Sequence, residues 1–432
     1  MLVKFRCKNF RSFRDEAILS MQATSGDEHR DFNTFEVDER LFPKGENVLL
    51  KSAVIYGPNA SGKSNLIKAI RYMQSVVVYS SAPALGVVKS NEPFALCDKC
   101  LHEPTVFEMT LIQDQVLYRY GFTIMDGRIQ DESLERKNER MTKVYQRRSG
   151  DISIIGLDDT TTRFIRIDDG ALFLSVFQQY HLPDSIAGDL NRVRTWFSRL
   201  LVVFEENVLP FVKYEQNPGF IEDALRIMRM ADIGIRDFSV YRDKIVLEKK
   251  TPYESLKAIE RLLSEPIQLN ADGGDLGKLD LKTVFDVRDE HGTVVGEKIV
   301  HLLRDREFHS EGTRRLMFYL GWILASLHEG RVILIDEIDT KFHVVLADYL
   351  MRMYNSIDRN PLNSQLVGTA HNILLMDGPV RRDQILFASK DPAGASSIRA
   401  LSDYKGVRKN DLFSKKYLLG FYSGVPDMTE DQ

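Results

Sequence analysis

Residues 57–64 combine the residue types and spacing that suit phosphate chemistry. They read GPNASGKS, which fits the pattern G-x-x-x-x-G-K-[ST] between an apolar strand and a helix. Glycines let the backbone curl so that its N–H groups converge on phosphate oxygens at the positive end of the following helix. Lys63 is placed to reach the β and γ phosphates, and the Ser64 hydroxyl to hold Mg²⁺. A plain glycine turn is the alternative, and the strand–loop–helix context disfavours it.

The loop predicts a site for ATP and Mg²⁺. The residues expected to contact the nucleotide are Gly57, Pro58, Asn59, Ala60, Ser61, Gly62, Lys63, Ser64 and Asn65.

An acidic partner for this loop stands far downstream, at Asp336 and Glu337. Both follow the apolar run VILI, typical of a buried parallel strand that ends at the edge of the sheet where α/β proteins bind ligands. We expect Asp336 to orient Mg²⁺ through a water and Glu337 to act as general base on the attacking water. An ordinary strand end is the alternative interpretation.

Two more segments frame this acidic strand. The polar turn Ser310-Glu311-Gly312-Thr313 precedes the helix pattern that leads into it, and His371 follows the next apolar strand in GTAHN. Ser310 or Thr313 could simply cap the helix that begins near Arg314. Their other roles depend on the resemblance described below.

The surrounding patterns predict the elements that must position these residues. Alternating apolar residues predict an N-terminal strand and then three antiparallel strands, turned once at Asp126-Gly127. Apolar residues three and four apart predict helices in the block 170–264, read as a helical insertion. A hairpin turned at His291-Gly292 follows, and the remainder alternates helix and strand, as parallel sheets do.

Bulk composition excludes several classes of protein. The 432 residues indicate two or three lobes, and a formal net charge of −4 gives no general attraction to nucleic acid or membrane. Transmembrane and signal-peptide patterns are not found, so we expect a cytoplasmic protein without a membrane partner. Cys97, Cys100 and His102 have metal-ligand spacing, but no second Cys/His pair follows, which favours an incidental thiol pair.

The ordered motifs resemble those of the ABC-type ATPase heads of the RecF/SMC group. The likeness covers NFRSF, GPNASGKS, SEGT, VILIDEID and GTAHN, and the ending KKYLLGFYSGVP adds a resemblance to bacterial abortive-infection and RloA-like (AAA_15/AAA_21-type) ATPases. This resemblance implies an α/β, two-lobed ABC ATPase head with a mixed sheet and covering helices, an antiparallel strand lobe and a helical insertion. The implied segments are 1–169, 170–264 and 265–432.

The resemblance also assigns roles to the two remaining motifs. SEGT looks like a shortened signature motif, in which Ser310, Gly312 and Thr313 contact the γ-phosphate held by another subunit. His371 looks like the switch histidine that senses this phosphate, and Asp339 resembles the dimer-contact aspartate. The Mg²⁺-contacting glutamine of such ATPases cannot be assigned among Gln74, Gln113 and Gln115.

The resemblance implies a slow, regulatory ATPase that forms a homodimer or higher oligomer around ATP. It would control an effector or toxin on a separate chain in anti-phage defence, because residues 372–432 are too few for the nuclease domain of overcoming-lysogenisation-defect nucleases. The alternative is a RecF-like DNA repair or recombination clamp. Basic segments 135–148 and 408–416 are solvated faces or non-specific nucleic-acid surfaces.

Overall fold

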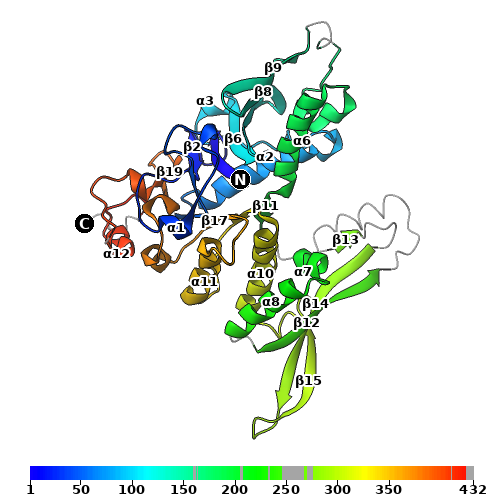
Figure 1. The fold of residues 1–432 in the computed structure, drawn as a ribbon, viewed down its shortest axis with the longest axis vertical. Coiled ribbons are helices and arrows are strands. Elements are labelled where there is room, and N and C mark those ends of the chain that lie inside the picture. The colour runs from blue at the N-terminus through cyan, green and yellow to red at the C-terminus, as the bar shows by residue number, and fades with distance from the viewer. Residues whose placement is uncertain are drawn as a thin grey trace. The chain divides into compact units, whose positions relative to one another are not determined.

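A computed structural model describes residues 1–158, 162, 164–204, 208–231, 234–245, 267–269, 276–409 and 411–424. The chain divides into two compact units (Figure 1). The first unit comprises Met1–Val202, Glu329–Asp339 and Ala347–Gln432, and the second comprises Val203–His328 and Thr340–Leu346. Among the described residues, no helix has the length and apolar character needed to cross a membrane.

A six-stranded, mostly parallel sheet lies in the first unit. Its strand order is β11 (Leu201–Val203), β16 (Val332–Ile335), β17 (Gln365–Thr369), β5 (Ser52–Tyr56), β18 (Ile385–Lys390) and β19 (Ser396–Ala400). Strands β16, β17, β5 and β18 run parallel, and β19 pairs antiparallel with β18. Every residue of β5, β16 and β17 is buried, which explains their nearly continuous apolar sequences.

A seven-stranded antiparallel sheet forms the second layer of this unit. Its order is β10 (Asp151–Ile154), β9 (Met141–Arg148), β8 (Arg128–Lys137), β7 (Val116–Met125), β6 (Thr105–Gln113), β1 (Leu2–Lys8) and β2 (Ala17–Ser20). The strands predicted from alternation are confirmed as β1, β6, β7 and β8. Asp126 and Gly127 have φ of 52° and 68°, the left-handed conformation of a tight hairpin turn. A small pair, β3 (Thr34–Glu36) with β4 (Val48–Leu50), completes the strands.

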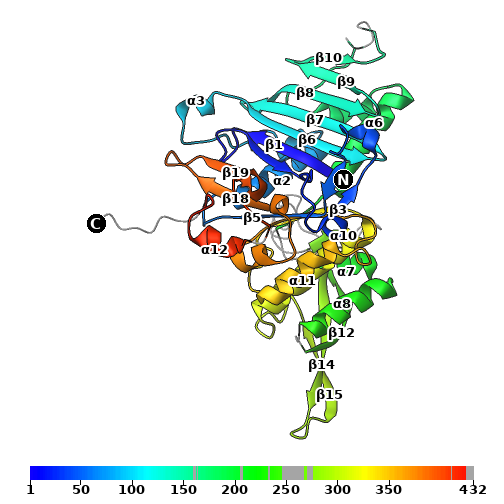
Figure 2. The same cartoon turned by 60° about the vertical axis from the view of Figure 1, so that its left-hand side comes forward.

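Helix α2 (Lys63–Tyr79) lies between these two sheets (Figure 2). Its Tyr72 ring lies 5.4 Å from the rings of both Phe10 and Phe107, so the helix packs on the antiparallel sheet. Helices α5 (Phe173–Val176) and α6 (Asp184–Arg199) pack against it. The unit also contains α1 (Arg30–Asn33), α3 (Asp98–Leu101), α12 (Phe413–Leu418) and most of α11 (Val344–Asn355).

The second unit packs three helices with a four-stranded sheet. The helices are α7 (Leu209–Tyr214), α8 (Pro218–Met230) and α10 (Glu311–Glu329), of which Glu329 belongs to the first unit. The strands are β12 (Ile235–Ile245), β13 (Ile267–Leu269), β14 (Leu276–Arg288) and β15 (Val294–His301). The hairpin predicted at His291-Gly292 is confirmed, with Gly292 at φ 81°. Strands β14 and β15 extend as a ribbon in both views (Figures 1 and 2).

The block 170–264, expected to be helical, also contains the short strand β11 and the longer strand β12. Residues of β12 pair along their whole length with β14, and this pairing satisfies backbone groups that a helix would have satisfied internally. Residues 246–264, the last part of this predicted helical block, lie outside the described residues. The two compact units also differ from the expected segments, because α5 and α6 belong to the first unit.

Candidate nucleotide-hydrolysis site

The loop of residues 57–62 is a tight cradle built from glycines. Gly57 has φ 149°, and a Cβ placed on it would lie 2.3 Å from the carbonyl oxygen of Ala388. Gly62 has φ 105° at the N-terminus of α2, and its Cβ would lie 2.8 Å from the Cβ of Ser396. Both positions therefore need glycine for backbone conformation and for space.

Lys63 is buried and folds back over this loop. Its Nζ donates to the carbonyl oxygens of Gly57 at 2.7 Å and Pro58 at 3.0 Å. Burial lowers the pKa of Lys63, while the carboxylates of Asp336 and Glu337 act in the opposite direction. Its two hydrogen bonds hold the Lys63 side chain inside the loop, where phosphate oxygens could replace the two carbonyls as acceptors.

The loop and the acidic strand meet although 272 residues separate them in sequence. The Ser64 hydroxyl donates to Oδ1 of Asp336 at 3.0 Å. Thr369, fully buried at the end of β17, donates to the same oxygen at 2.6 Å and accepts the amide N–H of Glu337 at 2.7 Å. One threonine hydroxyl therefore fixes both acidic residues, a role that the sequence analysis missed.

Glu337 and His371 face each other beside this contact. Oε1 of Glu337 lies 3.9 Å from Nε2 of His371, and about two fifths of each side chain is exposed. Glu337 has φ 55°, a left-handed conformation rare for a residue with a side chain and found often at functional sites. A half-exposed carboxylate next to an imidazole can accept a proton from a water at the mouth of the site.

Asp339 holds the loop that carries His371. Its Oδ2 accepts the amide N–H groups of His371, at 2.8 Å, and of Asn372. We call His371 and Asn372 the switch loop. The Asp339 side chain is almost fully buried, so within this chain it positions the backbone of the switch loop.

Polar side chains support the cradle from behind. The amide Nδ2 of Asn65 donates to the Ser12 hydroxyl at 2.8 Å, and Ser12 accepts the Ser396 amide N–H on its carbonyl at 2.7 Å. Ser12 lies in the NFRSF segment and Ser396 begins β19, so three distant segments meet behind Gly62. Only NFRSF gave a sequence signal, and no pattern identified Ser396.

The turn 310–313 belongs to the second unit and begins α10. The Ser310 hydroxyl accepts the Thr313 amide N–H at 3.0 Å, which is the geometry of a helix N-cap. A Cβ on Gly312 would lie 2.7 Å from the carbonyl oxygen of Lys341, and Glu311 forms an ion pair with Lys341. Ser310 therefore caps the helix, as one of the two interpretations of the sequence expected. Position 312 needs glycine because the Lys341 carbonyl leaves no room for a Cβ.

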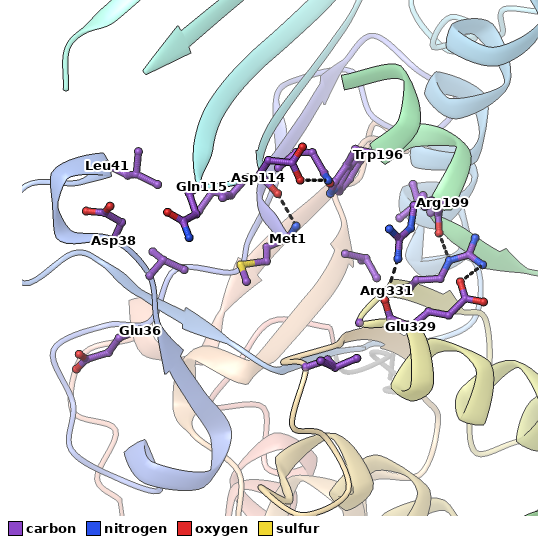
Figure 3. Close-up of a pocket in the computed structure, with 17 residues that line it drawn as sticks. Met1, Glu36, Asp38, Leu41, Asp114, Gln115, Trp196, Arg199, Glu329 and Arg331 are labelled. Carbon is purple, nitrogen blue, oxygen red and sulfur yellow. Dashed lines mark hydrogen bonds and ion pairs between the residues drawn. The ribbon is translucent and has the colours of Figure 1, made fainter. Parts of the chain in front are cut away.

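The three candidate glutamines are engaged in other contacts. Gln74 donates to the carbonyl oxygens of Phe197 and Leu200, each at 2.8 Å. Gln113 and Gln115 line a cavity of about 580 Å³ at the amino end of β16 (Figure 3). The candidate site lies at the carboxyl ends of β5, β16 and β17, so these positions do not assign the Mg²⁺-contacting glutamine.

The residues present fit a bound magnesium ion. The Ser64 hydroxyl and the Asp336 carboxylate are oxygen ligands of the kind that Mg²⁺ takes in phosphate-loop proteins, and they already lie within hydrogen-bond distance of one another. The glycine cradle beside them leaves backbone N–H groups at the start of α2 available to phosphate oxygens. The site therefore has the parts needed to bind a metal–triphosphate complex.

Comparison with known proteins places the chain in a family. The SMC head bound to the C-winged-helix domain of ScpA is 16% identical with a TM-score of 0.41, over 92% of this chain and 97% of that one. The SMC head domain from Thermotoga maritima is 13% identical with a TM-score of 0.35, over 92% and 98%. No curated protein matches the sequence. Residues 52–377, more than half of the chain, match the AAA_21 family, described as "AAA domain, putative AbiEii toxin, Type IV TA system", and the protein therefore belongs to that family.

Proposed function

We propose that this protein binds and slowly hydrolyses ATP, dimerises around the nucleotide, and regulates a partner effector in abortive infection. The observation that carries the proposal is the hydrogen bond between Ser64 and Asp336, which joins the phosphate loop to the acidic strand. Phosphate-loop ATPases need a hydroxyl and a carboxylate together at this place. A glycine turn or an ordinary strand end has no reason to bring them together.

Each side chain of the site has a separate role in the proposed reaction. Lys63 and the amide N–H groups at the start of α2 bind the phosphate oxygens. Glu337 accepts a proton from the water that attacks the γ-phosphorus, while the bond from that phosphorus to the β–γ bridging oxygen breaks. Ser64 and Asp336 would hold Mg²⁺, which when bound neutralises charge on the β and γ phosphates. His371, 3.9 Å from Glu337, would contact the γ-phosphate and orient the base.

The turn at Ser310–Thr313 would complete the site of a second subunit. Ser310 and Gly312 stand at the N-terminus of α10, a 19-residue helix whose positive end favours phosphate. The exposed Ser310 and Glu311 leave this end open on the surface of its own unit. A nucleotide-bound homodimer would then contain two composite sites, each with a phosphate loop from one chain and a signature turn from the other.

The role in defence rests on the family description, which includes a putative toxin of a type IV toxin–antitoxin system. We place the toxic activity on a partner because the described site contains the parts of an ATPase. A DNA-repair clamp is the alternative, and DNA-stimulated turnover with steep salt dependence would favour it. Turnover unchanged by DNA, together with suppression of a toxic partner, would support the regulatory role.

Subunit mixing tests the composite site. Lys63→Ala removes the phosphate-binding cation, and Gly312→Asp blocks the signature turn, so each variant alone should lose ATP turnover. A mixed dimer has one intact site, and random pairing should restore about a quarter of the wild-type rate. If mixing restores no activity although both variants remain folded, the signature turn does not act on a second subunit. If Lys63→Ala alone retains wild-type turnover, the ATPase assignment is wrong.

A further inference from the structure

Two free cysteines lie together in the first unit, outside the nucleotide site. Cys97 is the N-cap residue of α3 and Cys100 lies within its single turn, where the Cys100 amide N–H donates to the Cys97 carbonyl at 3.0 Å. Cys97 packs against the small apolar cluster that contains Cys100. Cys97 is half-buried, whereas Cys100 is 4% exposed and packs with Phe94 and Ala395.

The two thiols differ in ways that suit sequential chemistry. The neighbouring Cys100 side chain lowers the pKa of Cys97, and the nearby Arg14 guanidinium acts in the same direction. Burial raises the pKa of Cys100, and the neighbouring Cys97 raises it further. A thiolate is the reactive form of cysteine, so the more accessible thiol is also the more reactive one.

We propose that Cys97 and Cys100 form a reversible disulfide and so make a redox modification site on this ATPase. The oxidant is a peroxide. The Cys97 thiolate attacks one peroxide oxygen, the O–O bond breaks, and sulfenic acid forms at Cys97 with release of hydroxide. The Cys100 sulfur then attacks the Cys97 sulfur, which forms the S–S bond and expels the sulfenic oxygen as water. Overall, two thiols are oxidised while one hydrogen peroxide is reduced to two waters.

The chain connects this pair to the phosphate loop by two routes. Cys100 packs against Ala395, and the next residue, Ser396, lies directly behind Gly62. The buried Asn9 donates to the carbonyl oxygens of Cys100 at 2.7 Å and Glu103 at 2.9 Å.

Asn9 also precedes the turn that carries Ser12, whose hydroxyl lies 3.0 Å from the position of a Gly62 Cβ. Closing a disulfide brings the two sulfur atoms to a separation of about 2.05 Å, and we expect this to shift the turn of α3. Ser12 and Ser396 lie close behind Gly62, so a shift of either residue would reach the phosphate loop, and oxidation should weaken nucleotide binding.

The disulfide itself can be detected without any ATPase assay. Trypsin cleaves after Lys99, between the two cysteines, so an internal disulfide keeps peptides 90–99 and 100–119 joined until a reductant is added. The full-length protein is treated with hydrogen peroxide, digested without reductant, and analysed by mass spectrometry. Cys97→Ser and Cys100→Ser should each abolish the joined peptide, whereas Cys7→Ala, which removes the third cysteine, should leave it unchanged.

A titration with reduced and oxidised glutathione tests reversibility. The joined peptide should form with peroxide and disappear with excess reduced glutathione. Absence of the joined peptide in protein that retains its fold overturns the proposal. Oxidation of Cys7 to the same extent as Cys97 would also overturn it. Sulfinic acid at Cys97 without the disulfide would also overturn it, because it shows that Cys100 does not capture the intermediate.

The connection to Gly62 rests on the proposed nucleotide binding and has its own measurement. Oxidised wild-type protein should bind a fluorescent ATP analogue several-fold more weakly than reduced protein, and the Cys97→Ser variant should show no response to peroxide. If the disulfide forms while the affinity for the ATP analogue stays the same, the contacts through Ala395 and Asn9 do not transmit the change to the phosphate loop. If neither form binds nucleotide, the proposed function fails while the peptide result still stands.

Discussion

Thr369 gives the sharpest prediction about how the site is held together. It is fully buried, donates to Asp336 at 2.6 Å and accepts from the Glu337 amide at 2.7 Å. Replacing it with valine keeps the shape of the side chain and deletes only the hydroxyl. The Asp336 oxygen then retains the hydrogen bond from Ser64 but loses the one from residue 369, and the hydrogen bond from the Glu337 N–H to that residue is lost as well.

The expected size of the effect follows from these two bonds. A hydrogen bond to a carboxylate stabilises by about 1.5 kcal/mol at the low end of its range, and the hydrogen bond from the Glu337 amide adds about 1 kcal/mol. If the whole loss of about 2.5 kcal/mol raises the activation free energy, kcat falls roughly seventyfold. Some of the loss falls on the ground state, so we expect a decrease of about tenfold to seventyfold.

The assay is steady-state ATP turnover below the unfolding temperature of each variant. Thr369→Ser keeps the hydroxyl and is the matched control, with kcat expected within about threefold of wild type. KM for ATP should change little in either variant, because the loop that binds the phosphates is untouched. A Thr369→Val enzyme with wild-type kcat would refute the positioning role, and a fall equal to that of Thr369→Ser would assign the effect to packing.

Three further predictions test separate parts of the account. Gly62→Ala should abolish binding of a fluorescent ATP analogue, whereas Gly45→Ala, also at positive φ but with nothing within 4 Å, should only lower stability by about 1–2 kcal/mol. Asp339→Ala removes the acceptor of both switch-loop amides and should lower kcat about tenfold with little change in KM, while Asp339→Asn should lower it less. The hydrogen bond from Arg382 lowers the pKa of Glu28. The stabilisation that this pair gives the folded protein is therefore complete above the ordinary carboxyl pKa of 4.5, and it is lost as the pH falls through the lowered pKa. Urea unfolding should therefore find Glu28→Gln about 0.5–1 kcal/mol less stable than wild type at neutral pH, with the difference vanishing in acid.

Sequence patterns predicted the elements that are formed by residues close together in the chain. The phosphate loop joins a strand directly to a helix, so its pattern and context lie in one short segment. The hairpin turns at Asp126-Gly127 and His291-Gly292 are likewise encoded in adjacent residues and are confirmed. The run VILI predicted a buried strand because strands covered on both faces typically have such continuous apolar sequences.

Contacts between distant segments were not predictable in the same way. Thr369 is an ordinary strand residue until the parallel pairing of β16 and β17 brings it beside Asp336. Asp339 was interpreted as a dimer contact by resemblance, and its hydrogen bonds to the switch loop appear only in three dimensions. Strand β12 was missed because its alternation is interrupted by charged residues and its partner lies about 40 residues later.

ATP turnover by the Glu337→Gln variant tests the central claim most directly. Wild-type protein with Mg²⁺ should release phosphate slowly, and the variant should bind ATP with wild-type affinity but release almost no phosphate. Size-exclusion chromatography with light scattering should then show ATP-bound dimers that accumulate in the variant and disperse when ATP is removed. Phosphate release by Glu337→Gln at the wild-type rate would contradict the account, because the general base would have to be another residue.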